Sequence, residues 1–567
     1  MSQGRPDNAE GWVRLGVSLI EAGQTLSAPR CFAEAARLEP RNAQHQARLG
    51  KVLLSLRRYE SALEALEKAC AIEPRSAPWH TLLGYARREQ NDIDGALAAY
   101  ARAREADPQS LSCAVAEALL LPPIYRDMPD VERWRSRFEQ GLQRLHAELP
   151  DHPGWAAQVL GLEWENFSLA HQGRDDRRLQ TLYAEFVARL LAEALPQCQS
   201  REPRAESHGR RIRVGFLSSE LRTCTIGDYF GSWILGLPRD RFELRCYFTG
   251  SIRDDLTASI ANACDAFQAL PGGVETVAAR VRADRLDVLI FPDVGLTAQS
   301  YLLANLRLAP IQCAAWGHPV TTGSRHIEHY VSCAEMEPDG AAEHYRENLL
   351  LLPGLGVRYE QPRDTARRPR SDFGLPEKAH VYICPNRLHK ILPDWDDVVL
   401  DILTKDPEGI VVFFDTAAPG QRKAFVERLQ GKMAGRGIGP RRQIRFLPLL
   451  PRAEFRVALA LADVMLDTPN FSAGSSALDA LAVGLPIVAQ EGAFMRGRQS
   501  AAMLRIVGVS DLVVRHHGDC AELALRVATD RAYRSSLSER IRAGLPRLFD
   551  RGEPIAALAE TLRYLTS

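Results

Sequence analysis

The chain has 567 residues, of which 46% are hydrophobic and 25% charged, which is the composition of an ordinary globular protein with room for roughly three or four domains. Its 71 basic and 71 acidic residues cancel, so the charge balance argues against a general binder of nucleic acid or membrane surfaces. No apolar run approaches the roughly 20 residues that span a bilayer, and the first residues lack the basic-then-apolar pattern of a signal peptide.

Residues 1–108 repeat with a period of 34 residues. Small residues recur where two helices would cross, and a large apolar residue recurs beside them. A proline ends each unit, because Pro lacks an N–H and clashes with the preceding turn. The pattern predicts three tetratricopeptide hairpins, whose concave face we expect to hold another protein. The residues in register are Gly16, Gly50 and Gly84; Ala28, Ala62 and Ala96; Phe32, Leu66 and Tyr100; Ala35, Ala69 and Ala103; and Pro40, Pro74 and Pro108.

Residues 109–196 keep a helical period without the strict repeat and are expected to form a helical extension. Within them, the stretch 165–173 (ENFSLAHQG) is interpreted as the end of a helix at Gly173, with the next helix beginning near Asp175. Residues 197–210 are polar and poor in apolar side chains, which is typical of a linker.

From Arg211 onwards, short apolar runs alternate with helix-like segments. This alternation predicts parallel sheets covered by helices on both faces. Two such series indicate two Rossmann-like domains, at 211–365 and 374–545, with a break between Tyr359 and Phe373 and a C-terminal helix at 546–567. The fold class is therefore α + α/β, and ligands are expected at the carboxyl ends of the strands.

A loop rich in Gly and Ser precedes a helix in the second of these domains. It follows the apolar run DVMLDTP and contains Ser472, Gly474, Ser475 and Ser476. Such a loop leaves free N–H groups and the positive end of the helix dipole facing outward, which favours an anion. Asp479, one turn further, could accept hydrogen bonds from ribose hydroxyls. The pattern alone leaves open the alternative that the serines only cap the helix.

A basic segment follows the first strand of the same domain. Lys390 could neutralise a leaving diphosphate, with Asn386 and Arg387 beside it. The D-x-D spacing in 394–397 (DWDD) is interpreted as helix capping rather than as a metal site, and no His/Cys cluster has zinc spacing.

In the first domain, the stretch 317–323 (GHPVTTG) follows a strand. His318 lies between Gly and Pro at the tip of that strand, a position that favours a functional role.

Together these motifs resemble the tetratricopeptide-containing protein glycosyltransferases related to the O-linked N-acetylglucosamine transferases and SPINDLY-type proteins. The GHPVTTG stretch looks like the bacterial branch that includes the adhesin N-glucosyltransferases. The resemblance implies a GT-B pair of lobes, the first on the acceptor side and the second binding a UDP-sugar. It also implies inversion at the anomeric carbon, with no cofactor and no metal.

The resemblance also assigns donor-binding residues. Lys390 matches the lysine that holds the diphosphate, and Arg387 stands where well-known members have Gln. Ser475, Ser476 and Asp479 match the Thr-Thr and Asp of the nucleotide loop. Four further positions complete the set: Leu450 and Arg452 match the segment around the uracil, Phe455 replaces a His there, and Gly474 replaces the His before the threonines.

One departure from the family concerns catalysis. Cys224 occupies the position of the His usually assigned to catalysis or acceptor positioning. A thiol with a pKa near ~8.5 is a poor general base at neutral pH. Three outcomes stay open: Asp228 or His318 takes the role, the donor phosphate accepts the proton, or activity is weak or absent.

Three hypotheses follow. The first is an enzyme that moves N-acetylglucosamine or a hexose from UDP to a protein held by the repeats. The second is a scaffold that keeps donor binding without transfer, and the third is an enzyme acting on lipid or polysaccharide, for which no anchoring segment is apparent. The eleven cysteines form no C-x-x-C pair, and we expect a reduced, cytoplasmic setting without nucleic-acid or membrane partners.

Overall fold

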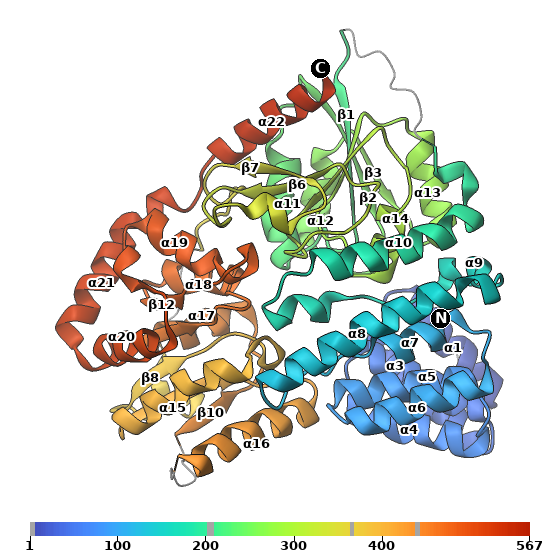
Figure 1. The fold of residues 1–567 in the computed structure, drawn as a ribbon, viewed down its shortest axis with the longest axis horizontal. Coiled ribbons are helices and arrows are strands. Elements are labelled where there is room, and N and C mark those ends of the chain that lie inside the picture. The colour runs from blue at the N-terminus through green and yellow to red at the C-terminus, as the bar shows by residue number, and fades with distance from the viewer. Residues whose placement is uncertain (1–5, 201–208, 363–367, 437–442) are drawn as a thin grey trace. The chain divides into compact units, whose positions relative to one another are not determined.

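The computed structural model describes residues 6–200, 209–362, 368–436 and 443–567. They form two compact units (Figure 1). The first comprises the chain up to Gln158 together with Thr416–Arg428, and the second comprises Val159–Asp415 together with Leu429–Ser567. Within the described ranges, no helix has both the length and the apolar character needed to cross a membrane.

The first unit is helical throughout. Its antiparallel hairpins pair α1 with α2, α3 with α4 and α5 with α6, and each hairpin packs on the next. The helices are α1 (Ala9–Glu21), α2 (Ala28–Leu38), α3 (Ala43–Ser55), α4 (Tyr59–Ile72), α5 (Ala77–Glu89), α6 (Ile93–Ala106), α7 (Leu111–Leu119), α8 (Met128–Glu148) and α9 (Trp155–Gln158).

The crossing points of these hairpins confirm the repeat pattern. A Cβ built on Gly84 would lie 2.4 Å from the ring of Tyr100, and one on Gly50 would lie 2.6 Å from Leu66. Only Gly leaves room there for the large residue of the facing helix. The second helix of each hairpin ends two residues before the repeated proline, at Leu38, Ile72 and Ala106.

A segment from much later in the chain completes the first unit. The backbone N–H of Gly420 donates to Oε1 of Gln90 at 2.7 Å, and Nε2 of Gln421 donates to the carbonyl of Glu89 at 2.9 Å. Ala418 is buried in the apolar cluster formed by the second and third hairpins.

The expected helical extension 109–196 does not form one body, because its residues up to Gln158 belong to the first unit and the rest to the second. In the second unit it contributes two 3₁₀ segments, η3 (Val159–Gly161) and η4 (Phe167–Gln172), and the helix α10 (Arg177–Ala194). The expected linker 197–210 falls largely on residues 201–208, which lie outside the described residues.

The first lobe of the second unit contains a parallel sheet of seven strands in the order β3-β2-β1-β4-β5-β6-β7. The sequence patterns predicted β1, β2, β4 and β5 but not β3, β6 and β7. The segment AFQA of β3 is only partly apolar, unlike the equally short VLIF of β4, and the NLLLL run of β7 has no alternation. The strands are β1 (Ile212–Ser218), β2 (Phe242–Phe248), β3 (Ala266–Ala269), β4 (Val288–Phe291), β5 (Ile311–Ala315), β6 (His329–Cys333) and β7 (Asn348–Leu352); the helices are α11 (Thr225–Gly236), α12 (Asp255–Ala263), α13 (Val274–Ala283) and α14 (Ala298–Ala304).

The second lobe contains a parallel sheet of six strands in the order β10-β9-β8-β11-β12-β13. Its strand order reverses between β8 and β11, the place where ligands bind in such folds. The strands are β8 (His380–Ile383), β9 (Gly409–Phe414), β10 (Ile444–Leu447), β11 (Val464–Asp467), β12 (Ile487–Gln490) and β13 (Val513–Val514); the helices are α15 (Asp396–Lys405), α16 (Pro419–Gly435), α17 (Arg452–Ala460), α18 (Ser475–Ala482), α19 (Gln499–Val507), α20 (His517–Thr529), α21 (Arg531–Gly544) and α22 (Glu553–Thr566).

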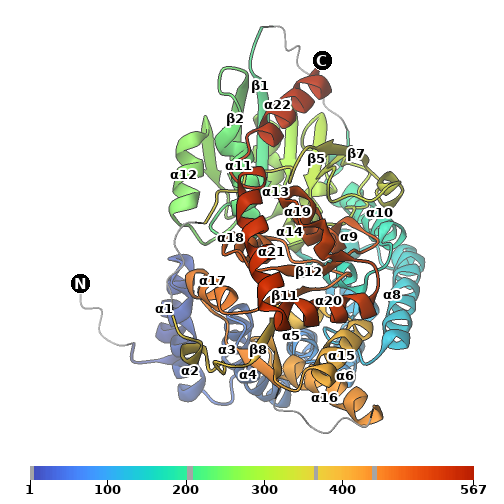
Figure 2. The same ribbon diagram turned by 90° about the vertical axis from the view of Figure 1, so that its left-hand side faces the viewer.

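The C-terminal helix α22 returns to the first lobe, where it packs against α11 and β7. Both views show it along that lobe (Figures 1 and 2). Arg241 donates to Glu560 of α22 at 2.8 Å, and Ile555 packs over Gly236 of α11. The chain therefore crosses between the lobes twice, once after β7 and once before α22.

The glycine crossings yield a stability prediction. Replacing Gly84 with Ala should lower the free energy of unfolding of the first unit by about 1–3 kcal/mol, because the new methyl group overpacks the ring of Tyr100. Urea titration of the full chain followed by far-UV circular dichroism would measure this. Gly154→Ala is the matched control, since nothing lies within 4 Å of its Cβ; equal midpoints for both variants would contradict the crossing geometry.

Candidate functional site

Two loops meet at the carboxyl ends of β8 and β11, which are neighbours in the second sheet. Asn386, which follows β8, is buried and ties the loops together. Its Nδ2 donates to Oγ1 of Thr468 at 2.7 Å and to the carbonyl of Phe471 at 3.2 Å. Asn386 thus holds the two loops together, and its expected contact with the donor stays a prediction.

The loop after β11 is fixed by Asp467, the last residue of that strand. Its carboxylate accepts hydrogen bonds from Oγ of Ser472 at 2.6 Å and from the N–H of Ala473 at 2.7 Å. Burial raises the pKa of Asp467 to about 6, because its effect is larger than the opposing effect of these hydrogen bonds, which lower the pKa. Because the hydroxyl of Ser472 is directed inward to Asp467, this serine holds the loop in shape.

The loop ends where α18 begins. Gly474 is the N-cap residue, and Ser475 and Ser476 are the first two helical residues; all three are half-buried. The first N–H groups of a helix have no partner within it and carry the positive end of its dipole. The N-terminus of α18 therefore offers two backbone donors and two hydroxyls at the edge of the sheet, as the sequence predicted.

Lys390 lies at the other side of the same edge, in η8 (Leu388–Lys390). Its ammonium is 3.8 Å from the centre of the Phe471 ring, a cation–π contact. Burial, followed by the positive charge of Arg387, lowers the pKa of Lys390 to about 8. Phe471 thereby connects Lys390 to the loop that precedes α18. Arg387 itself is exposed.

The first lobe approaches this edge with helix α11. Oγ1 of Thr225 lies 3.1 Å from Oγ of Ser475, so the N-termini of α11 and α18 are in contact. Cys224 is the N-cap residue of α11. Its thiol lies 3.5 Å from the Glu220 carboxylate, and burial raises its pKa to about 11. The thiol is therefore protonated at neutral pH.

His318 lies in the loop after β5. Its Nδ1 is 3.1 Å from the carbonyl of Val294, and its backbone carbonyl accepts from the Tyr330 hydroxyl at 2.9 Å. Burial lowers the pKa of His318 to about 3, so the imidazole is neutral. Its Nε2 is buried and has no hydrogen-bond partner in the described part of the chain.

The sequence did not predict the buried carboxylate that holds this loop. Oε2 of Glu347 accepts from Oγ1 of Thr321 at 2.6 Å, and its Oε1 accepts from the N–H of Thr322 at 2.8 Å. Glu347 precedes β7, about 25 residues further along the chain, so no local pattern could indicate the pairing.

The segment η4 (Phe167–Gln172) contributes residues that the sequence interpretation missed. Gly173 does end it, with φ of 63°. The ring of His171 lies 4.8 Å from that of His389 and 5.2 Å from that of Phe471. Burial, then the neighbouring His389 and Lys390, hold the pKa of His171 well below its usual value. The only available signal was a histidine within an otherwise apolar turn.

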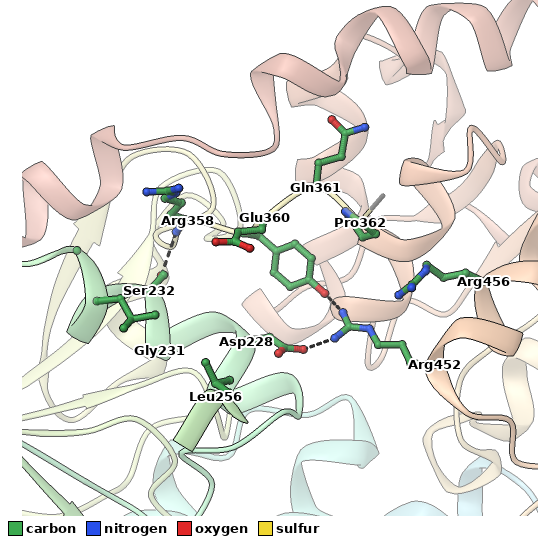
Figure 3. A pocket seen from close by; sticks show the side chains of 14 residues that line it. Asp228, Gly231, Ser232, Leu256, Arg358, Glu360, Gln361, Pro362, Arg452 and Arg456 are labelled. Carbon is green, nitrogen blue, oxygen red and sulfur yellow. Dashed lines mark hydrogen bonds and ion pairs between the residues drawn. The ribbon is translucent and has the colours of Figure 1, made fainter. Parts of the chain in front are cut away.

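An open cavity of about 370 Å³ lies beside these loops (Figure 3). Four elements line it: α11 and the start of α12 in the first lobe, the connection at 358–362, and the start of α17. Arg452 lines the cavity, ion-paired with Asp228 and bonded to the hydroxyl of Tyr359. Its Nε is 3.4 Å from Oδ2 of Asp479, whose other oxygen is 3.6 Å from Arg456.

These contacts concern the role suggested for Asp228. The sequence offered it as a substitute for the missing histidine, and in the structure one oxygen of its carboxylate is paired with Arg452 in the cavity. Oδ1 of Asp479 has no hydrogen-bond partner among the described residues, which leaves it able to accept one. Phe455 packs against Phe414 at 5.2 Å between ring centres. Neither Phe455 nor Leu450 is among the residues that line the cavity.

The D-x-D segment has a structural explanation. Oδ1 of Asp394 accepts from the N–H of Trp395 at 2.9 Å, and buried Asp396 lies 3.8 Å from Lys432. Within the described residues, no group of three or more His, Cys, Asp or Glu side chains is arranged to hold a metal ion.

Comparison with known proteins gives matches over most of the chain. Residues 354–549 match glycosyl transferase family 41, and residues 13–78 and 53–120 match tetratricopeptide repeat families. The probable UDP-N-acetylglucosamine–peptide N-acetylglucosaminyltransferase SEC of Arabidopsis thaliana is 25% identical over 345 residues, 59% of this chain and 35% of that protein. The probable UDP-N-acetylglucosamine–peptide N-acetylglucosaminyltransferase SPINDLY of Solanum lycopersicum is 27% identical over 270 residues, 47% of this chain and 28% of that protein. The chain thus spans about a third of the length of these relatives.

Among solved structures, a mutant of the O-GlcNAc transferase of Thermobaculum terrenum superposes with a TM-score of 0.74 at 22% identity, covering 98% of this chain and 97% of that chain. This likeness shows a shared fold, in which tetratricopeptide helices precede a GT-B pair of Rossmann-like lobes. Together these matches identify the chain as a tetratricopeptide protein with a glycosyl transferase family 41 region, homologous to the SEC and SPINDLY proteins.

Proposed function

We propose that the chain transfers a sugar from a UDP-sugar to a protein side chain. The observation that carries this proposal is the meeting of Lys390 with the loop that opens α18, joined through Phe471 at the edge of the second sheet. A cation and a helix N-terminus at the point where the strand order reverses form a site for a diphosphate. The printed names of the relatives make N-acetylglucosamine the first donor to test, with a hexose as the alternative.

The same groups would serve the chemical step. When the acceptor attacks the anomeric carbon, the bond to the diphosphate breaks and negative charge grows on the departing oxygen. Lys390 and the N–H groups of Ser475 and Ser476 would stabilise that charge, which is normally the largest catalytic contribution. We propose a single displacement with inversion and without a metal ion, because these residues supply the positive charge.

The acceptor's proton requires a base that is unprotonated at neutral pH. Cys224 does not fit, because burial raises its pKa to about 11. Asp228 does not fit either, because its carboxylate is paired with Arg452. His318 and His171 are both neutral, and each has a buried Nε2 without a hydrogen-bond partner in the described chain. We propose His318 as the group that takes the proton, with His171 as the second candidate. Because burial lowers the pKa of both imidazoles and makes them weak bases, the donor phosphate stays the alternative acceptor.

The nucleoside would occupy the cavity of Figure 3. Its volume of about 370 Å³ suits a uridine. Oδ1 of Asp479, next to the lining residues Arg452 and Arg456, accepts no hydrogen bond in the described chain and would accept one from a ribose hydroxyl. Arg452 would border the base, with Leu450 and Phe455 further along the same segment. Ribose binding would compete for the carboxylate that Arg452 and Arg456 now share.

The acceptor would be a polypeptide bound by the repeats, since tetratricopeptide arrays present a concave surface to such partners. We place the reaction in the cytoplasm, because all eleven cysteines are free thiols and disulfides are rare in that compartment.

A specific observation favours a second candidate function, a scaffold that binds donor without transfer. The protonated thiol of Cys224 stands where the family's histidine would be. Incubating the full chain with UDP-sugars and cell lysate, followed by mass spectrometry, separates the two. Modified protein supports the enzyme, whereas donor binding without modification supports the scaffold.

Lys390→Ala should abolish transfer and weaken UDP binding by about 10- to 100-fold, the value of one hydrogen bond to a charged group. Titration calorimetry and a transfer assay would measure both. Lys405→Ala is the matched control, since that lysine is exposed on α15 and pairs with Glu522 at 3.6 Å. Undiminished turnover in Lys390→Ala would refute the assignment.

The affinity for UDP should depend on pH through Lys390. Its lowered pKa of about 8 means that the free protein loses this charge as the pH rises above 8. UDP affinity should therefore be constant between about pH 7 and 8 and fall about tenfold per unit above it. Lys390→Arg, which stays charged, should remove the fall; an identical decline in that variant would show that another group titrates.

Cys224 should react slowly with iodoacetamide at pH 7.5, because a pKa of about 11 leaves very little thiolate. Labelling followed by peptide mass spectrometry should show the rate rising about tenfold per pH unit up to pH 10. Cys224→Ser should retain transfer. Rapid labelling at pH 7.5, together with loss of transfer in Cys224→Ser, would contradict this expectation and indicate that the Cys224 thiolate is the base.

A further inference from the structure

Helix α11 of the first lobe presents three polar side chains to the donor loop of the second. Thr225, Asp228 and Tyr229 are spaced i, i+3 and i+4, so they lie on one face of the helix. Thr225 contacts Ser475 at 3.1 Å, and Asp228 pairs with Arg452. Tyr229 completes this face, and its hydroxyl is directed at Gly474.

The position of the Tyr229 hydroxyl is defined by the glycine it approaches. A Cβ built on Gly474 would lie 2.8 Å from that oxygen and 2.9 Å from Oε1 of Gln499. Gly474 is the N-cap residue of α18, so the phenol reaches the N-terminus proposed to hold the diphosphate. The hydroxyl occupies the space that any side chain at position 474 would need.

This hydroxyl has no hydrogen-bond partner among the described residues, although Tyr229 is only 4% exposed. Buried tyrosine hydroxyls are normally paired, because an unpaired one loses its bonds to water without replacement. The ring is well packed, edge-on to Phe230 and Tyr359, and phenylalanine would pack there equally well. Packing therefore accounts for the ring but not for the oxygen.

The hydroxyl is also in the right state to donate. Burial, with the negative charges of Asp228 and Asp479, raises the pKa of Tyr229 far above its usual value. The group thus remains an O–H throughout the physiological range. An anion that brings acceptor oxygens to the end of α18 would satisfy it.

We propose that Tyr229 is a diphosphate ligand supplied by the first lobe, donating its hydroxyl to a phosphate oxygen of the nucleoside diphosphate seated at the N-terminus of α18, with Thr225 beside it. The proposal rests on the proposed function, since it concerns the same donor site. It adds that donor binding requires both lobes, because Lys390 and Ser475 come from one and Tyr229 from the other.

The test is calorimetric titration of the full chain with UDP and, separately, with uridine. Tyr229→Phe removes only the oxygen and should weaken UDP binding by about tenfold or more, the value of a hydrogen bond to a charged group. Uridine binding should not change, because it carries no phosphate. Tyr247→Phe is the matched control, a buried tyrosine of β2 in the same lobe whose hydroxyl donates to Asp284 at 2.7 Å.

Equal UDP affinity in Tyr229→Phe and wild type would overturn the proposal, as would an equal loss of uridine and UDP. Failure of the wild-type chain to bind UDP would instead overturn the proposed function, and the proposal with it. Thermal unfolding would check that Tyr229→Phe folds. If Tyr229→Phe does not fold, Thr225→Val tests the proposal instead, because Thr225 is exposed and its replacement should not disturb the core. Loss of the Thr225 hydroxyl should lower UDP affinity and leave uridine affinity unchanged. Unchanged UDP affinity in Thr225→Val would then overturn the proposal.

Discussion

The hydrogen bonds of Asn386 are the constraint on which the site depends. This one amide, at the end of β8, binds Thr468 and the carbonyl of Phe471 in the loop after β11. The loop is thereby held against the segment that carries Lys390, and Asp467 fixes its far end through Ser472 and Ala473. Without these two polar residues, the cation and the start of α18 would lie on separate, independent loops.

The charged and polar groups at the edge of the second sheet favour the binding of an anion. Lys390 is a cation whose burial lowers its pKa and whose ammonium lies 3.8 Å from the centre of the Phe471 ring. A diphosphate would restore its charge and accept from the N–H groups of α18. Burial lowers the pKa of the nearby imidazoles of His171 and His318, so both are neutral and add no positive charge to the site. In the adjoining cavity, Arg452 is balanced by Asp228 and Asp479.

The sequence predicted the fold well because its signals were local. The 34-residue period, the alternation of strands with helices and the loop before α18 can each be recognised in the order of residue types along the chain, without knowing which distant segments touch. The partly polar β3 and the uniform β7 lacked such a signal. The site was predicted in part: Lys390 and Ser475 follow strands, and that placement can be inferred from order alone. The contacts of His171, Glu347 and Tyr229 could not be predicted, because each joins segments far apart in the chain.

The most direct test of the central claim is a crystal structure of the full chain with bound UDP. The account predicts the diphosphate at the N-terminus of α18, within hydrogen-bond distance of the N–H groups of Ser475 and Ser476 and of the Lys390 ammonium. UDP bound elsewhere, or a diphosphate that contacts neither Lys390 nor the start of α18, would contradict it.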